Sequence, residues 1–196
     1  MLGGIKMIRK ISFVLAVLTT LLLATEVENV LDPCQLLTKQ EVEKVLKRPM
    51  KAGKLGKSNA LFGTLSCSYL SVDRFDNSAS AVLNIGTTTF MKENDAVFES
   101  AKEKYEKEKN AYMGALKRQN KADTFEAVKG LGDEAYWGTV SLHIFKGDTF
   151  INIKISASAG MRAKSSQEME KMVKKRNLTL SKEIAQIILQ KLKQTK

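Results

Sequence analysis

The chain has 196 residues, of which 43% are hydrophobic and only two are prolines. This composition indicates one folded domain with a hydrophobic core, and it excludes a low-complexity chain or a repeat array. The formal net charge of +11 at pH 7 favours anionic partners over cationic ones.

Residues 1–24 are predicted to be a secretory signal peptide. Lys6, Arg9 and Lys10 form a basic head without an acidic residue, and residues 11–24 form an apolar run that is short for a membrane span. We therefore expect export to the periplasm or the extracellular space, and no transmembrane segment in the mature chain. An uncleaved N-terminal anchor is the alternative. Residues 25–196 are expected to form a single α+β domain.

Cys34 and Cys67 are the only two cysteines. An even number of cysteines in an exported chain favours a disulfide bond between them. The alternative is a metal site with two thiolate ligands. The chain has one histidine, His143, and no Cys-x-x-Cys pair, so support for that site is lacking. We expect no metal ion and no cofactor.

The segment 38–46 predicts a helix. Thr38 and Glu41 have the spacing of a capping box, Leu37 and Val42 have that of a hydrophobic staple, and Pro49 ends the helix.

Two antiparallel strands are expected next, after a loop rich in glycine and lysine. They span residues 65–72 and 78–88, and they flank a turn at 73–77. A long charged helix is predicted over 94–119, and its packed stripe consists of Phe98, Ala101, Tyr105, Tyr112 and Leu116.

Residues 130–137 have the sequence GLGDEAYW. The two glycines are expected to take positive φ at a turn that starts a strand, and Asp133 is expected to bond nearby amides. Asp133 and Glu134 are adjacent on an extended segment and point to opposite sides, so they are not expected to act as a glycosidase pair. Tyr136 and Trp137, with His143, form a candidate binding surface, although a single tryptophan is more often part of the core.

A β-hairpin is predicted around Gly147 and Asp148, which form a favoured two-residue loop. Pairing outward from this loop sets Phe145 opposite Phe150 and His143 opposite Asn152. Two helical segments are expected to follow, separated by a break within 176–182 at which Ser181 caps the second helix. Together these elements predict an α+β fold, an α/β sandwich in which helices cover the apolar face of a mostly antiparallel sheet.

No catalytic constellation is evident in the sequence. Catalysis by a serine nucleophile would need His143 as its base, and no partner carboxylate is apparent for it. EF-hand loops, P-loops and a dinucleotide fingerprint are absent. The sequence therefore predicts that the protein is not an enzyme.

The motifs Asp32-Pro33-Cys34, the capped segment 36–46, Cys67 followed by Ser-Tyr-Leu, and residues 128–137 together resemble a bacterial exported family of unknown function. This family is best known from actinobacterial lipoproteins, and the match extends from about Asp32 to Leu192. The resemblance implies a Cys34–Cys67 disulfide and an α/β sandwich similar to PsbP-like domains, but it carries over no catalytic residue. The chain departs from the family because it lacks a lipobox cysteine.

The C-terminal part of the chain is strongly basic. From Arg162 to Lys196 there are ten lysines and arginines against three glutamates. This excess is either a site for an anionic partner or a solvated helix face.

We expect a non-catalytic exported module that binds an envelope component or another exported protein, and no nucleic acid. The alternative is a carrier with a pocket for a small apolar ligand between sheet and helices, lined by residues such as Phe98, Met113 and Phe150. The oligomeric state stays open.

Overall fold

The structure is a computed structural model that describes residues 31–194 apart from 57–59, 74–77 and 158–160. Residues 31–196 form one compact unit. The predicted signal peptide, residues 1–24, lies outside the described residues.

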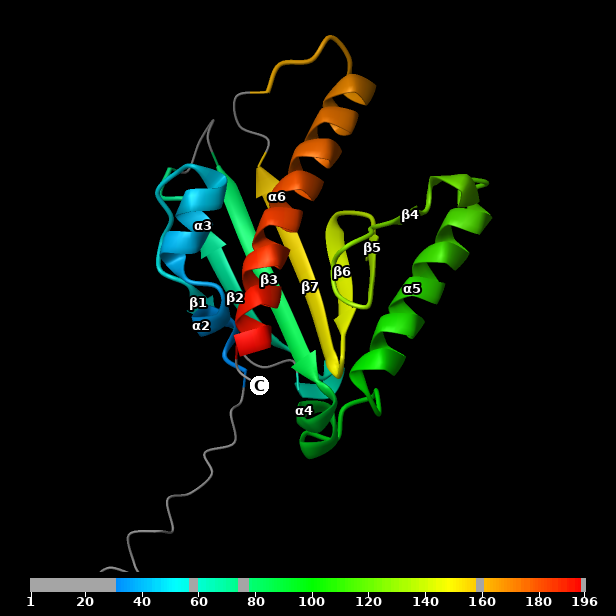
Figure 1. Cartoon of the computed structure of the whole chain (residues 1–196). Coiled ribbons are helices and arrows are strands. Elements are labelled where there is room, and N and C mark those ends of the chain that lie inside the picture. The colour runs from blue at the N-terminus through cyan, green and yellow to red at the C-terminus, as the bar shows by residue number, and fades with distance from the viewer. Residues whose placement is uncertain (1–30, 57–59, 74–77, 158–160, 195–196) are drawn as a thin grey trace, which may run out of the picture. The chain divides into compact units, whose positions relative to one another are not determined.

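The centre of the fold is a seven-stranded sheet in which every pair of neighbouring strands is antiparallel (Figure 1). The order across the sheet is β1-β2-β3-β7-β6-β5-β4, so β3 and β7, which are distant in the sequence, pair in the middle. The strands are β1 (Lys54–Leu55), β2 (Leu65–Leu70), β3 (Ala79–Thr87), β4 (Glu126–Ala127), β5 (Glu134–Trp137), β6 (Ser141–Lys146) and β7 (Thr149–Ala157). The expected α+β class is confirmed.

Helices cover both faces of the sheet, whereas the sequence predicted helices over one apolar face. Side chains alternate along each strand, and both sets find hydrophobic partners, because two separate core clusters form. One cluster joins the sheet to α2 (Pro33–Leu36), α3 (Lys39–Leu46) and α6 (Ser166–Gln194). The other joins it to α4 (Thr88–Glu93) and α5 (Ala101–Arg118). Short 3-10 helices occur at Ala60–Phe62 and Ala122–Thr124.

The predicted hairpin is confirmed residue by residue. Phe145 pairs with Phe150, and His143 pairs with Asn152, as the loop at Gly147 and Asp148 requires. Gly147 has a φ of 61°, which explains why glycine suits this turn. The register places alternate residues of both strands in the cluster that faces α6, and these are Leu142, Ile144, Ile151, Ile153 and Ile155.

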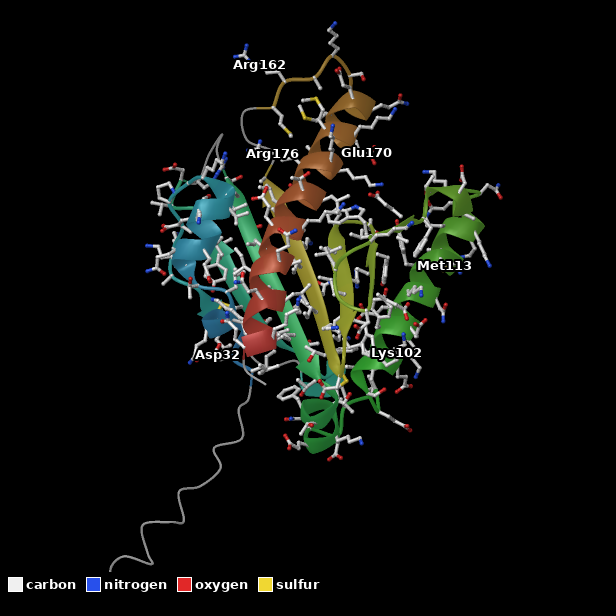
Figure 2. The ribbon with its side chains drawn as sticks, viewed as in Figure 1. Asp32, Lys102, Met113, Arg162, Glu170 and Arg176 are labelled. Carbon is white, nitrogen blue, oxygen red and sulfur yellow. A yellow bond between two sulfur atoms is a disulfide. The ribbon has the colours of Figure 1, made fainter. Side chains whose placement is uncertain are left out.

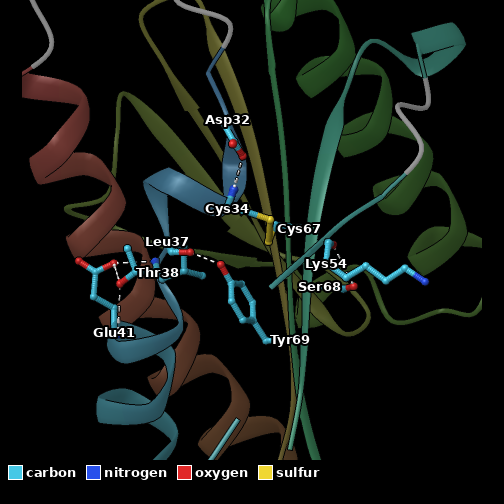
Figure 3. The surroundings of a disulfide bond; sticks show 9 residues. All are labelled: Asp32, Cys34, Leu37, Thr38, Glu41, Lys54, Cys67, Ser68 and Tyr69. Carbon is cyan, nitrogen blue, oxygen red and sulfur yellow. Dashed lines mark hydrogen bonds between the residues drawn. A yellow bond between two sulfur atoms is a disulfide. The ribbon is translucent and has the colours of Figure 1, made fainter. Parts of the chain in front are cut away.

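The expected disulfide is present. Cys34 and Cys67 are joined with a Cα–Cα distance of 5.2 Å, and the bond ties α2 to β2 (Figure 3). The bond closes a loop of 33 positions and so stabilises the fold by about 3 kcal/mol, chiefly by restricting the unfolded chain.

The surroundings of this bond fix the approach to α3. The capping box between Thr38 and Glu41 is present as predicted. The Tyr69 hydroxyl donates to the carbonyl of Leu37, and burial, together with the charges of Asp32 and Glu41, raises the pKa of Tyr69 to about 12 (Figure 3).

The long charged helix is shorter than predicted. It begins at Ala101 rather than near residue 94, because the Ser100 hydroxyl accepts from the backbone N–H of Glu103 and caps the helix there. Asp95 adopts a φ of 46°, which separates α5 from the short helix α4. Phe98 therefore lies before the helix rather than on its packed stripe.

The predicted break between two C-terminal helices is wrong, because α6 is continuous over 29 residues. Ser181 is fully buried in the middle of α6 and is not a cap. Asn177 accepts a hydrogen bond from the backbone N–H of Ala157 at the end of β7, and Ile184 packs in the core. These tertiary contacts outweigh the weak helix propensity of the local sequence.

The continuous helix leads to a prediction for Ser181→Ala. Within the described residues, the Ser181 hydroxyl is buried without a hydrogen-bond partner, and alanine has a higher helix propensity by about 0.5 kcal/mol. We expect the free energy of unfolding, measured with urea, to stay equal or rise by up to about 1 kcal/mol. The control Thr38→Ala removes a true cap and is expected to lose about 1 kcal/mol. If Ser181→Ala lowers the free energy of unfolding by a similar amount, Ser181 acts as a helix cap and the expectation fails.

Candidate functional site

The GLGDEAYW segment ties two parts of the sheet together. Gly130 and Gly132 have φ values of 79° and 65°, as predicted. A Cβ atom on Gly132 would lie 2.5 Å from the carbonyl oxygen of Phe145, so the chain approaches β6 too closely for any other residue.

Asp133 connects its own turn to the β6–β7 hairpin. Its carboxylate accepts from the backbone N–H of Gly147 at 2.6 Å and from Lys146 Nζ at 2.6 Å, and both bonds hold the pKa of Asp133 below its usual range. Glu134 instead pairs with Lys102 and Lys109 of α5. The two carboxylates therefore serve separate contacts.

Tyr136 and Trp137 do not form an exposed binding surface. Their relative exposures are 1% and 2%, and they belong to the two different core clusters because neighbouring residues of β5 point to opposite faces. Trp137 lies in the cluster with α6, where its Nε1 has no hydrogen-bond partner among the described residues. Tyr136 lies under α5 and stacks on the His143 ring, with ring centroids 4.6 Å apart.

His143 is the centre of a polar row that crosses the sheet beneath α5. The strand pairing places Tyr136, His143, Asn152 and Asn84 side by side on β5, β6, β7 and β3. Only 14% of the His143 side chain is exposed, so its ring nitrogens depend on protein partners.

Glu108 of α5 supplies the carboxylate that the sequence did not reveal. Its Oε2 lies 3.0 Å from His143 Nδ1, and its Oε1 lies 2.8 Å from Lys104 Nζ. The other ring nitrogen of His143, Nε2, lies 2.9 Å from the Ser141 hydroxyl. Glu108, His143 and Ser141 are thus connected in the order carboxylate, imidazole and hydroxyl, which we call the histidine array.

Two asparagines complete the surroundings of Ser141. Asn152 Nδ2 donates to the Ser141 hydroxyl at 3.1 Å, and Asn84 Nδ2 donates to Asn152 Oδ1 at 3.1 Å. Asn152 Nδ2 is also 3.1 and 3.3 Å from the two nitrogens of His143. A donor that is nearly equidistant from both nitrogens is poorly aligned with either lone pair, so Ser141 is its better acceptor. The bond from Asn84 therefore fixes the amide with its nitrogen toward Ser141.

The charged state of Glu108 is favoured in this setting. Burial alone raises the pKa of its carboxyl group, but hydrogen bonds from His143 and Lys104 outweigh burial, so the pKa lies below its usual value. Lys104 is itself nearly buried, and its ammonium lies 4.5 Å from the ring centroid of Phe98 and 5.0 Å from that of Phe150.

One sequence signal for Glu108 existed. Tyr105, Glu108 and Tyr112 are spaced three and four residues apart, which places a carboxylate within the packed stripe of the helix. The premise that His143 has no carboxylate partner is wrong. The expectation that the protein is not an enzyme stays a prediction.

The residues expected to line an apolar pocket pack against other groups. Phe150 is buried in the aromatic cluster with Tyr105 and Tyr136, and with Phe98 it surrounds the Lys104 ammonium. Met113 lies half-buried on α5 (Figure 2).

Two depressions of about 260 and 290 Å³ occur elsewhere in the described part of the chain, and both are open to solvent. Residues 130–132, Lys146 and the last turns of α6 line the first of them. Neither depression is the enclosed pocket that a carrier requires.

The second feature of note is the basic segment, residues 161–176. It includes the first eleven residues of α6 and has six lysines and arginines against two glutamates. No residue of the segment is buried, and Figure 2 shows Arg162, Glu170 and Arg176 around this end of α6. Its lysines Lys164, Lys171, Lys174 and Lys175 are exposed.

Comparison with known proteins gives no identification. No family model, no curated protein and no solved structure matches the chain. The described residues contain no cluster of three potential metal ligands, and no helix among them has the length and apolar character needed to cross a bilayer.

The lowered pKa of Glu108 leads to a prediction about acid stability. A carboxyl group whose pKa is lower in the folded state stabilises the fold above its unfolded pKa, near 4.5, and this contribution is lost as the pH falls further. We expect the free energy of unfolding to fall less steeply below pH 4.5 in Glu108→Gln than in the wild type. In His143→Gln, the free energy of unfolding is also expected to fall less steeply below pH 4.5. The double variant is expected to change this slope little more than either single variant does. Equal slopes in all four proteins, measured by urea unfolding, would contradict the array as a coupled unit.

Proposed function

We propose that the protein is an exported module that binds an anionic component of the cell envelope, and that the basic segment is its contact surface. The exposure and charge of residues 161–176 carry this proposal. The disulfide supports an oxidising compartment outside the cytoplasm, which is where the predicted signal peptide directs the chain.

The lysines of the basic segment remain available to a partner. Lys174 lies 3.1 Å from Glu126, but both side chains are well exposed, so this ion pair contributes little stability. Lys171 and Lys175 have no acidic partner within ion-pair distance among the described residues. They are four positions apart and therefore project from the same side of α6.

Apolar side chains accompany this charge. Met161, Met169 and Val173 are half-buried, and Met172 is 36% exposed. Methionine side chains adapt to irregular surfaces because they are unbranched and polarisable. A surface that combines lysines with methionines suits a partner that has both anionic and apolar groups, such as a layer of anionic lipid headgroups.

The carrier alternative receives no support from the described residues. Its three expected lining residues, Phe98, Met113 and Phe150, surround a charged ammonium or lie on the flank of α5. An apolar ligand at Lys104 would displace the ion pair between buried Lys104 and half-buried Glu108 rather than fill an empty pocket.

Charge reversal tests the proposed surface. We expect Lys171→Glu/Lys175→Glu to weaken binding to vesicles of phosphatidylglycerol and phosphatidylcholine at least about tenfold, because each lysine near an anionic surface contributes about 1 kcal/mol. Binding of the wild type is expected to fall steeply between about 50 mM and about 300 mM salt. The measurement is vesicle co-sedimentation of the mature protein.

The matched control is Lys117→Glu/Lys121→Glu. It makes the same change in net charge at two exposed lysines, also four positions apart in the sequence, of which Lys117 lies in the last turn of α5 and Lys121 just after that helix. We expect this control to bind nearly as well as the wild type. If both variants lose the same affinity, net charge rather than the basic segment determines binding. If a polymer such as poly(glycerol phosphate) binds and vesicles do not, the envelope component is a polymer rather than a lipid. Absence of binding to either probe would overturn the proposal.

A further inference from the structure

The histidine array lies in a layer that is otherwise aromatic. Tyr105, Tyr136 and Phe150 surround it, and each is at most 1% exposed. Replacing linked charged groups in such a layer with packed apolar side chains is often neutral or stabilising. Stability alone therefore gives a weak account of why Lys104, Glu108 and His143 are linked at this position.

The order and distances of the contacts match those of a nucleophile–base–carboxylate triad. With a proton on Nδ1 directed to Glu108, the His143 Nε2 has a free lone pair directed to the Ser141 hydroxyl. Nε2 and Oγ are 2.9 Å apart, within the range at which an imidazole removes a hydroxyl proton. Glu108 holds the tautomer and stabilises the imidazolium that results.

The imidazole ring is held on its flanks. Tyr136 stacks against it with an interplanar angle of 9°, and Asn152 occupies the neighbouring position on β7. A Cβ atom on Gly138 would lie 3.0 Å from Nε2, so the β5–β6 turn leaves little space for the ring to move toward it. The base is therefore pre-oriented without a substrate.

Asn152 provides a donor beside the nucleophile. Its Nδ2 is 3.1 Å from the Ser141 hydroxyl, which places it close to where negative charge develops when that oxygen attacks a carbonyl group. The bond from Asn84 keeps the nitrogen rather than the oxygen of this amide on that side.

Ser141 is the first residue of β6. It is half-buried and directly follows the exposed residues Thr139 and Val140 of the β5–β6 turn. We infer that a small acyl group would approach Ser141 from this turn.

The geometry points to a second activity, beyond the proposed binding function: hydrolysis of small carboxylic esters, in which Ser141 is the nucleophile and His143 the general base. Glu108 positions His143, and Asn152 stabilises the developing oxyanion. Ester rather than amide substrates fit, because a single side-chain donor at the oxyanion suffices only for a substrate with a good leaving group.

The reaction balances with water as the only co-reactant. Ser141 Oγ forms a bond to the carbonyl carbon while its proton passes to His143 Nε2. The bond from that carbon to the alkoxy oxygen then breaks, and the proton on Nε2 leaves with the alcohol. A water molecule attacks the acyl-serine, gives its proton to Nε2, and releases the carboxylic acid as that proton returns to Ser141.

The decisive experiment treats the mature protein with a fluorophosphonate probe, which reacts with activated serines, and locates the label by peptide mass spectrometry. We expect the label on Ser141 and hydrolysis of p-nitrophenyl acetate. Both should be lost in Ser141→Ala, and hydrolysis should fall about 100-fold in His143→Gln and at least about tenfold in Glu108→Gln. The labelling rate at Ser141 should also fall at least about tenfold in His143→Gln, because the probe reacts with a serine that the imidazole activates.

Controls separate catalysis from structure and from the binding function. Ser80→Ala changes another half-buried serine on the same sheet face and should keep the full rate. Lys171→Glu/Lys175→Glu should also keep it, so failure of vesicle binding and failure of labelling are distinguishable. A wild-type protein that is not labelled at Ser141 overturns the inference by itself, whether or not the variants fold. A rate that is unchanged in His143→Gln overturns it as well.

Discussion

The antiparallel ladder between β3 and β7 is the constraint on which the rest of the structure depends. It pairs every residue of β3 with one of β7, from Ala79 opposite Ala157 to Thr87 opposite Thr149. This ladder joins the two hairpins, β2–β3 and β6–β7, into one sheet. Its register determines which side chains become neighbours across the whole sheet, including Asn84 and Asn152. A slip of one residue would move Asn84 to the opposite face and disconnect the polar row.

The pleat of this sheet also separates the histidine array from the helix that carries the basic segment, because neighbouring residues of a strand point to opposite faces. The array under α5 uses the face on which Tyr136 lies, whereas the part of α6 that follows the basic segment packs on the face of Trp137. Adjacent residues of one short strand thus belong to opposite sides of the molecule. The contacts of His143 reported above come from α5, β5, β6 and β7, so the two proposals are open to independent test.

Local signals in the sequence predicted the elements whose contacts are also local. The capping box at Thr38 and the Gly147 turn each lie within a few residues of the groups they organise, and the structure has both. The disulfide followed from the number of cysteines and the predicted compartment rather than from geometry.

Contacts between distant segments could not be predicted in the same way. The continuity of α6 depends on a bond from Asn177 to Ala157, which no helix propensity encodes. Glu108 and His143 are far apart in the sequence, and only the packing of α5 on the sheet brings them within 3.0 Å. The sequence predicts a strand after the two glycines, but it does not reveal the helix layer that buries Tyr136, and for this reason it indicates a candidate binding surface there.

The unbroken course of α6 has a mechanical consequence. A helix of 29 residues is a rod of about 43 Å, and its second half is clamped to the sheet by Ile184 and Ile188 and to α2 and α3 by Lys191, which bonds Leu36 and Glu41. The first eleven residues of α6, 166–176, contain no buried residue, and they are helical before any partner arrives. A partner that binds this segment does not have to order the helix. A disordered basic tail would lose conformational entropy on binding, whereas in this protein that entropy is lost when the chain folds.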